Sequence, residues 1–229
     1  MQNTQERSLI EVAFQQMKKA IIYGELAPGE KLKVASLSKS YGLSSSPIRE
    51  ALNRLSQEGV VVASDNRGFR VAALSVDDFE QITRLRCLLE CEALADAIEQ
   101  GDDDWEANVI GAFHRLCLAE KKLAGRSVAL DNDWTERHRA FHFALFSACT
   151  SDRLLRIIDS LFDQAERYRR YSALNRTSVR NKSDEHRRLM DVALERDGKA
   201  AVELLEQHIK GTLKSVTAAL RLQENATLQ

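Results

Sequence analysis

The chain has 229 residues, of which 44% are hydrophobic, so it is long enough to bury a full core and to form two domains. Its 33 Lys and Arg residues against 34 Asp and Glu residues give a net charge of −1, so the overall charge does not indicate a nucleic-acid partner. Charged residues interrupt every apolar run before it reaches the roughly 20 residues of a membrane span, and no signal peptide is recognisable, so we expect a cytoplasmic protein without a membrane partner.

The charge is divided unevenly along the chain. Residues 1–75 contain ten Lys and Arg against seven Asp and Glu, a net charge of +3, whereas residues 76–229 contain 23 against 27, a net charge of −4. A positive segment suits the phosphate backbone of DNA, and a dimer would double that charge. Because the excess is small, the prediction of a DNA partner depends on the motif that follows.

The first predicted elements are two helices that end at glycines. Residues 9–23 place apolar side chains on one helical face, Gly24 ends this helix, and residues 26–30 have the composition of a turn. A second helix is predicted over residues 34–41 and ends at Gly42. Only three residues separate Gly42 from Ser46, which is the tight spacing of a helix-turn-helix.

A third helix and a hairpin are predicted over residues 44–71. Ser46 is the expected N-cap and Pro47 the first helical residue, and apolar residues then recur at helical spacing until Gly59. Two short strands, residues 60–62 and 69–71, flank a basic turn over residues 65–68. In a winged helix-turn-helix, such a helix enters the major groove of double-stranded DNA and the hairpin contacts the adjacent backbone. The candidate DNA-contacting residues are Ser44, Ser45, Ser46, Arg49, Asn53, Arg54, Arg67 and Gly68. The alternative is a small helical domain that merely ends in a hairpin.

Residues 76–229 are predicted to be helical throughout, because they contain no proline and no alternating strand pattern. Helices are expected near residues 76–99, 103–125, 130–149, 152–174, 179–195 and 198–222, with Asp104, Ser151 and Asp197 as N-caps. Short loops between them favour a bundle with room for a cavity, and its first helix, apolar over much of its circumference, is expected at the centre. The predicted fold is therefore mainly α, with a winged helix-turn-helix DNA-binding domain over residues 1–75 and an all-helical effector- and metal-binding domain over residues 76–229.

Four of the five histidines lie in the later helices. His138 and His142 are four residues apart and project from one face of one helix, while His186 and His208 lie on the last two helices. Three helices of an antiparallel bundle could direct four imidazoles to one point, which is enough for a divalent metal. Each histidine could equally be an ordinary core or surface residue, which is the interpretation we give to His114.

Several motifs resemble the GntR family of bacterial transcription regulators. The segments PGEKL, LSKSYGLSSSPIREALNRLSQEGVV and RGFRV are similar to its DNA-binding unit. The C-terminal half resembles the FCD ligand-binding domain of the FadR-like subfamily, in the Arg86–Glu90 pair, the AFHFAL segment and EHRRLMDVALERDGKAAVELLEQHI. Within that subfamily, WTERHRAFHFALFSACTSDRLL and LFDQAERYRRYS look most like the carbon-starvation-induced branch, whose effector is glutarate. The resemblance extends over about residues 10–215.

The resemblance implies that His142, His186 and His208 ligate a divalent metal at the floor of an effector pocket. The usual fourth protein ligand of the family is an aspartate four residues before the first histidine, and this chain has His138 there. A shell made only of imidazoles favours zinc or nickel over manganese or magnesium. The substitution leaves open whether His138 coordinates at all.

The expected effector is a small organic acid, because a metal and a guanidinium together bind carboxylates well. Arg86 is a candidate for the guanidinium, although it could instead pair with Glu90 four residues along its helix. A dicarboxylate needs a cation at each end, and the second could come from the arginines of a cluster formed by Arg167, Tyr168, Arg170 and Tyr171. This cluster could instead form a solvated charged face.

The DNA-binding half departs from the family pattern at two positions. Many relatives carry arginine where this chain has Ala35 and Ser45, whereas Arg49 is retained. We expect Arg49 to contact a guanine edge or a phosphate, and the operator to differ from the commonest one of the subfamily.

The sequence thus predicts a homodimeric DNA-binding transcription regulator, a repressor released by its effector, and no enzyme. One alternative is a metal-dependent hydrolase: HRAFH has the two histidines of a zincin helix, but Arg139 stands where the general-base glutamate belongs. Another is a helical interaction scaffold in which the histidines are incidental.

Overall fold

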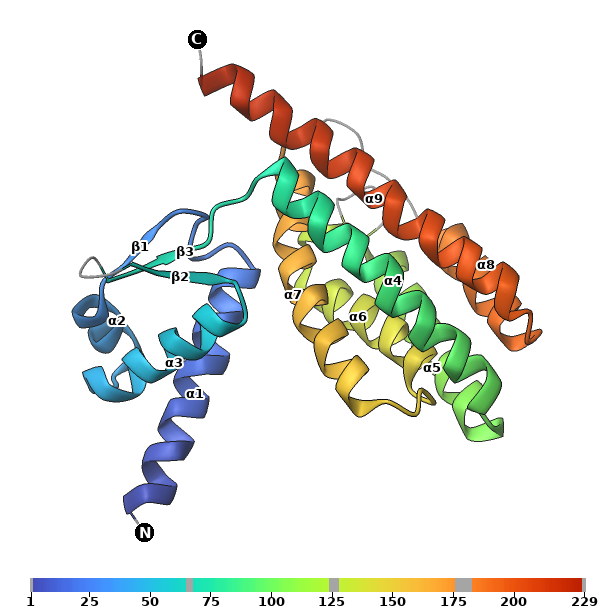
Figure 1. The fold of residues 1–229 in the computed structure, drawn as a ribbon, viewed down its shortest axis with the longest axis horizontal. Coiled ribbons are helices and arrows are strands. Elements are labelled where there is room, and N and C mark those ends of the chain that lie inside the picture. The colour runs from blue at the N-terminus through green and yellow to red at the C-terminus, as the bar shows by residue number, and fades with distance from the viewer. Residues whose placement is uncertain (1, 65–67, 124–127, 176–182, 228–229) are drawn as a thin grey trace. The chain divides into compact units, whose positions relative to one another are not determined.

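The computed structural model describes residues 2–64, 68–123, 128–175 and 183–227. The contacts within the chain divide it into two compact units, Met1–Ser75 and Val76–Gln229. Each unit has a hydrophobic core of its own, and each is described by itself (Figure 1).

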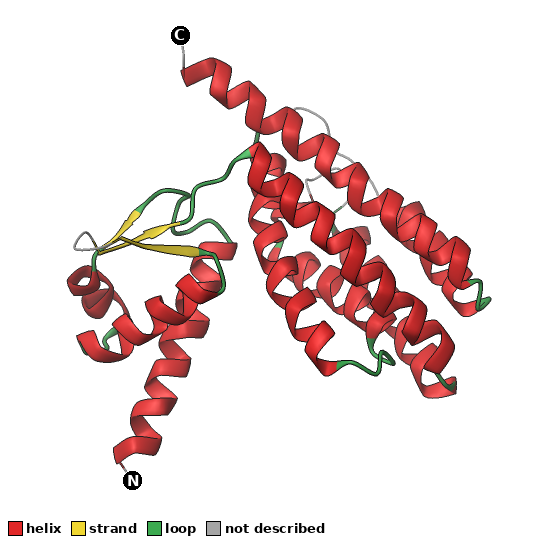
Figure 2. Cartoon of the chain, viewed as in Figure 1, coloured by secondary structure: helices red, strands yellow, loops and turns green. Residues whose placement is uncertain are grey.

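The first unit combines helices with a small antiparallel sheet (Figure 2). Its elements are α1 (Gln2–Ile22), β1 (Lys31–Leu32), α2 (Val34–Tyr41), α3 (Ser45–Gln57), β2 (Val61–Ser64) and β3 (Gly68–Val71). The strand order is β1-β3-β2, with Leu32 opposite Phe69 and Val61 opposite Val71. Strands β2 and β3 were predicted, but no strand was predicted between the turn at residues 26–30 and α2, so β1 was missed.

Helix α3 begins earlier than predicted. Its N-cap is Ser44, with an extended backbone, and Ser45 is the first helical residue, so the prediction of Ser46 as the cap is wrong by two residues. Pro47 then occupies the third helical position. A proline is tolerated there because the first four N–H groups of a helix have no acceptor within the helix.

One face of α3 forms the centre of the first unit's core. Ile48, Leu52 and Leu55 are completely buried and belong to the same cluster as Phe14 and Met17 of α1. Burying an aliphatic side chain of this size contributes about 1.5–3 kcal/mol. Because this face holds the helix against α1, the opposite face of α3 is presented to solvent.

The second unit contains only helices in the residues that the structure describes. They are α4 (Val76–Gln100), α5 (Asp103–Lys122), the short 3-10 helix η1 (Val128–Leu130), α6 (Asn132–Phe146), α7 (Asp152–Leu174), α8 (Ser183–Leu194) and α9 (Gly198–Thr227). The cap of α5 is Asp102, which accepts a hydrogen bond from the Trp105 backbone N–H, so the prediction of Asp104 is wrong. Ser151 does cap α7, as predicted.

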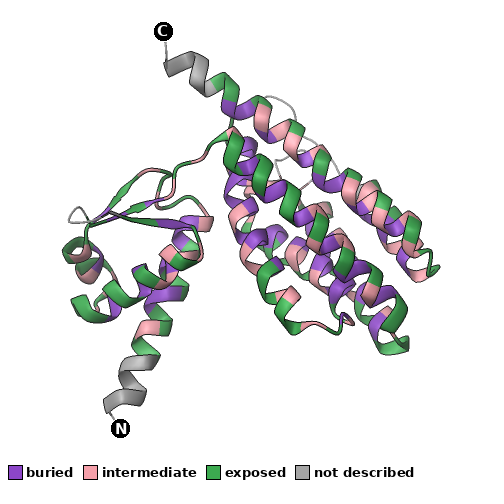
Figure 3. Cartoon of the chain, viewed as in Figure 1, coloured by how far each residue is buried: buried purple, intermediate pink, exposed green. Residues whose placement is uncertain are grey.

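Helix α4 packs against α9, α7 and α6, which agrees with the central place predicted for it. Its apolar circumference is not fully covered within the chain, since Leu85 and Leu88 are exposed. Buried and exposed residues alternate along α4 and α9 in Figure 3, as expected for helices with one face in a core.

These arrangements confirm the predicted fold class: mainly α, with an N-terminal winged helix-turn-helix and a C-terminal helical bundle. None of the helices within the described ranges has an apolar stretch that could cross a lipid bilayer.

Candidate functional site

The exposed face of α3 carries most of the residues proposed to contact DNA. Ser44, Ser45, Ser46, Arg49 and Asn53 are all exposed. They lie at the N-terminal end and along the outer side of α3, opposite the face that packs on α1. This is the side of a helix-turn-helix that can enter a major groove.

Arg54 is engaged differently from the other α3 candidates. Its Nη1 donates a hydrogen bond to Glu11 of α1 over 2.8 Å, and its guanidinium lies 4.0 Å from the centre of the Phe14 ring. These contacts hold Arg54 against α1. It therefore stabilises the packing of α1 on α3 rather than standing with the exposed residues of the outer face.

The wing provides one described candidate. Gly68 opens β3 with a φ of +84°, a conformation that favours glycine, and it is exposed. Arg67 lies outside the described residues. Arg70 of β3 is exposed as well, and its guanidinium donates to the backbone carbonyl of Gly29.

The four late histidines form one buried cluster in the second unit. His138 and His142 come from α6, His186 from α8 and His208 from α9, with exposed fractions between 0% and 7%. One ring nitrogen from each lies within 4.8 Å of those of the other three. The Nε2 atoms of His138 and His142 are 3.2 Å apart. Three helices, α6, α8 and α9, therefore bring the four imidazoles to one point, as the spacing predicted.

The surroundings of the cluster fix two of its rings. The indole of Trp134 stacks on the His138 ring with centroids 4.6 Å apart, and Nδ1 of His138 lies 3.1 Å from Nη1 of Arg169. Nδ1 of His208 lies 2.9 Å from a carboxylate oxygen of Glu185. The cluster therefore packs against the Trp134 ring and contacts one cationic group, Arg169, and one anionic group, Glu185.

Burial lowers the pKa of His138 and of His142 well below the usual value of 6.5, and the nearby Arg169 and the other histidines lower it further. Both imidazoles are therefore neutral at physiological pH. A neutral imidazole has the lone pair that a metal ion requires.

These lowered pKa values predict that the metal-free protein is destabilised by mild acid. Between pH 6.5 and the lower pKa of the folded state, the unfolded chain binds more protons than the folded chain. The free energy of unfolding should therefore fall as the pH falls through this window, by about 1.4 kcal/mol per pH unit for each such histidine. Urea denaturation of the metal-free protein between pH 7.5 and 5.5 measures this slope.

Two variants give this measurement a control. His142→Phe removes one buried titrating group and should reduce the slope by the share of one histidine. His114→Gln changes an exposed histidine and should leave the slope as it is. An unfolding free energy that does not vary over this pH range in the unsubstituted protein would contradict the expectation.

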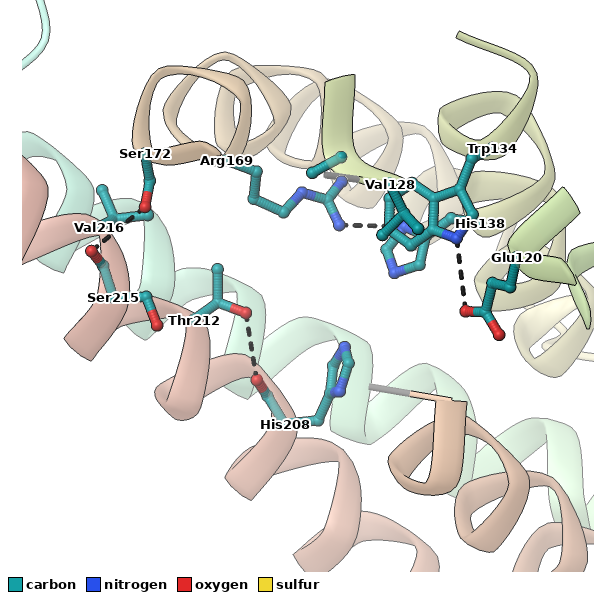
Figure 4. A pocket seen from close by; sticks show the side chains of 11 residues that line it. Glu120, Val128, Trp134, His138, Arg169, Ser172, His208, Thr212, Ser215 and Val216 are labelled. Atoms are coloured by element: carbon teal, nitrogen blue, oxygen red, sulfur yellow. Dashed lines mark hydrogen bonds between the residues drawn. The ribbon is translucent and has the colours of Figure 1, made fainter. Parts of the chain in front are cut away.

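A cavity of about 60 Å³ lies beside the histidines. Since one water molecule needs about 10–15 Å³ in this measure, the cavity has room for a few waters or for part of a small organic molecule. Figure 4 shows His138, Arg169 and His208 around it. Hydroxyl groups of Thr212 and Ser215 on α9 line another side.

The four residues proposed from sequence to bind the effector do not line this cavity in the described part of the chain. Arg86 instead forms a buried ion pair with Glu90, 2.6 Å from Nε to Oε1, which was the alternative interpretation. Tyr168 donates its hydroxyl to Asp78 over 2.6 Å. Arg170 donates to the backbone carbonyl of Leu130.

Arg167, Tyr168 and Arg170 are all buried, so the alternative of a solvated charged face is wrong for them. The arginine that does line the cavity is Arg169, within the same ERYRRYS run. Arg169 was not among the predicted residues although its neighbours were, because the run contains three arginines and only the packing of α7 decides which one faces the histidines. Glu185 was missed as well, although it stands one position before His186.

Comparisons with known proteins agree with this architecture. Residues 9–71 match the model of the bacterial regulatory proteins of the gntR family, and residues 81–211 match that of the FCD domain. The uncharacterized HTH-type transcriptional regulator BphR of Paraburkholderia xenovorans strain LB400 is 40% identical over 210 residues, which are 92% of this chain and 86% of that protein. The HTH-type transcriptional repressor GlaR of Escherichia coli K12 is 35% identical over 208 residues, 89% of this chain and 94% of that protein.

Solved structures give the same fold. The E. coli McbR/YncC structure superposes with a TM-score of 0.75 at 22% sequence identity, over 94% of this chain and 98% of that one. The matched families and relatives are transcription regulators and not enzymes, which removes the hydrolase alternative. The chain belongs to the GntR family of bacterial regulatory proteins and carries an FCD domain as its C-terminal half.

Proposed function

We propose that this regulator is a cytoplasmic homodimeric repressor that leaves its DNA operator when a small organic acid binds in the cavity beside the histidine cluster. A dicarboxylate such as glutarate is the ligand class that we favour. The single observation that carries the proposal is the meeting of four buried imidazoles, one arginine and a cavity within the second unit.

The DNA-binding half of the proposal rests on the outer face of α3. Arg49 is exposed there and combines with three serine hydroxyls at the N-terminal end of the helix. Arginine donates two parallel hydrogen bonds to the edge of guanine, and serine donates to bases or phosphates. We assign base or phosphate contact to Arg49, supported by Ser44, Ser45, Ser46 and Asn53, with Gly68 and Arg67 on the wing.

The histidine cluster fits a divalent metal. The imidazoles of His138 and His142 are neutral, and one nitrogen from each of the four rings lies within 4.8 Å of the others. Glu185 accepts a hydrogen bond from His208, in the way that a carboxylate commonly orients a metal-bound histidine. His142, His186 and His208 would hold the ion, and imidazole ligands favour zinc or nickel. When bound, the metal would supply a positive centre for an anionic oxygen of the effector.

The cavity supports an acid as the effector. Arg169 and His138 stand at one side of it and His208 at another, so a carboxylate would meet a guanidinium close to the metal position. The hydroxyls of Thr212 and Ser215 could accommodate a second polar end. We therefore propose that Arg169, and not Arg86, Arg167 or Arg170, provides the guanidinium that binds the effector carboxylate.

Release of DNA requires that the effector binds two states of the dimer with different affinity. In the repressing state both winged helix-turn-helix units would fit the two halves of an operator. In the effector-bound state their spacing or orientation would not match DNA.

A mobility-shift titration tests this proposal. DNA around the protein's own gene serves as the probe, and dicarboxylates of three to six carbons are added to the zinc-loaded protein. We expect the matching acid to weaken operator binding by about 5- to 150-fold, the usual range of coupling between two sites. Removal of the metal with a chelator should abolish the response to the acid. If no acid shifts the complex, or if the metal-free protein responds equally, the effector assignment fails.

A further inference from the structure

We propose that His138 is a hydrogen-bond donor beside the metal and not one of its ligands, and that Arg169 is the residue that holds it in this role. The metal shell then consists of three imidazoles, those of His142, His186 and His208. This inference rests on the proposed metal site and specifies how that site is built.

The contact with Arg169 decides which nitrogen of the His138 ring carries the proton. Its Nδ1 lies 3.1 Å from Nη1 of Arg169. A guanidinium has only N–H donors, so Nδ1 of His138 must be the acceptor. In a neutral imidazole the proton is then on the other nitrogen, Nε2.

The other ring nitrogen of His138, Nε2, faces the cluster. Nε2 of His138 lies 3.2 Å from Nε2 of His142. Two nitrogens that share a tetrahedral zinc at about 2.0–2.1 Å stand about 3.3 Å apart, so the distance alone fits two ligands as well as it fits a hydrogen bond. The proton on His138 decides between them. Its Nε2 donates to His142 and has no lone pair to offer a metal.

His208 provides the contrasting case within the same cluster. Its Nδ1 lies 2.9 Å from Glu185, and a carboxylate accepts the proton of that nitrogen. In the neutral ring, Nε2 of His208 then keeps a lone pair directed away from Glu185. This is the usual arrangement of a metal-binding histidine, whose second nitrogen donates to a carboxylate or carbonyl. At His138 the second nitrogen, Nδ1, faces a cation instead of a carboxylate, so it accepts a hydrogen bond where a metal-binding histidine would donate one.

Arg169 is itself held firmly in place. Its Nη2 forms an ion pair with Glu166 at 2.5 Å, its guanidinium lies 4.5 Å from the centre of the Phe162 ring, and its side chain is only 11% exposed. Moving this cation away from His138 would break a largely buried ion pair, which is costly. Arg169 therefore acts as a positioning residue for His138.

The consequence is a site that presents two hydrogen-bond donors beside the proposed metal position. His138 and Arg169 both line the cavity, as does His208 (Figure 4). With His142 engaged as a metal ligand, Nε2–H of His138 would lose its acceptor and could donate to an anionic oxygen in the cavity. An ionised aspartate at position 138 could only accept hydrogen bonds. His138 instead offers a hydrogen-bond donor beside the proposed metal position.

Cobalt binding to three variants tests the inference. The variants are His138→Phe, Arg169→Met and the double substitution, and Co²⁺ affinity is measured by competition with a coloured chelator on the full-length, metal-free protein. His138→Phe should change the affinity by less than about threefold, because a non-ligand is removed. Arg169→Met should raise it by about tenfold or more, because the proton of His138 can then move to Nδ1 and leave the lone pair of Nε2 for the metal.

The double variant separates the roles of charge and coordination. If Arg169 acted only by repelling the metal, Arg169→Met would raise the affinity equally whether residue 138 is His or Phe. We expect a larger rise with His138 present, and a visible Co²⁺ spectrum that gains an imidazole ligand only in the Arg169→Met protein. Equal rises, or a loss on His138→Phe as large as that on His142→Ala, overturn the inference.

Nitrogen NMR of the metal-free protein gives an answer that is independent of metal affinity. With ¹⁵N-labelled histidine only five side chains are observed. His138 should carry its proton on Nε2, and should lose this preference in Arg169→Met. A proton on Nδ1 overturns the inference while leaving the proposed metal site intact. Absence of Co²⁺ binding by the unsubstituted protein overturns both.

Discussion

Replacing His186 and His208 together by alanine should abolish metal binding and the response to the effector while the helices persist. Structural zinc sites bind with about 10–16 kcal/mol for a full ligand set, so losing two ligands should cost about 5 kcal/mol or more, on the order of 10⁴-fold in Kd. The helical content should remain because the core around Leu94, Leu116 and Leu145 does not depend on these two rings.

Metal content after dialysis, measured by mass spectrometry, and circular dichroism together check this expectation. His114→Ala is the matched control, since His114 is exposed and stands apart from the cluster. The control should bind one metal per chain and release DNA with the acid as the unsubstituted protein does. A double variant that still carries a full complement of metal would show that the ligands have been assigned wrongly.

The second large effect is expected on the DNA side. Arg49→Ala should weaken binding to the specific operator by about 1–3 kcal/mol, the range measured for arginines that contact base edges. Fluorescence anisotropy on the operator and on an unrelated duplex of the same length measures both affinities. The loss should be concentrated on the operator, and the stability of the protein should hardly change because Arg49 is exposed.

Arg54→Ala is the informative comparison for Arg49. Arg54 contacts Glu11 and Phe14 of α1, so its removal should lower the stability of the first unit more than it lowers operator affinity. If Arg49 contacts a phosphate instead of a base, its loss would weaken both duplexes alike and reduce the salt dependence of binding by about one unit. Unchanged affinity for both duplexes would remove Arg49 from the interface.

Hydropathy spacing predicted most of the fold, because periodicity is a property of whole segments. The six α-helices that the structure describes in the second unit were predicted in order, and α7 was predicted over the residues that it occupies. Local choices were less predictable. Each helix start offers three residues that can serve as the N-cap: Asp102, Asp103 and Asp104 before α5, and Ser44, Ser45 and Ser46 before α3. Composition alone therefore does not show which of the three adopts the extended backbone of the N-cap.

The candidate site, like the fold, could be predicted only in part. The four histidines could be brought together from sequence because their helices and their spacing restrict where they point. Which arginine joins them could not be found in this way, since Arg167, Arg169 and Arg170 have the same chemistry within four residues and differ only in the side of α7 on which they lie. Strand β1 escaped detection because two residues carry no period, and its partner Phe69 is distant in sequence.

The order in which the histidines occur along the chain has a consequence for synthesis. The cluster draws on α6, α8 and α9, and His208 of α9 is its last member in chain order. During translation the nascent chain would therefore lack one of the proposed ligands until α9 emerges from the ribosome. A fragment that ends before α9 would keep the other three imidazoles and should bind the ion more weakly.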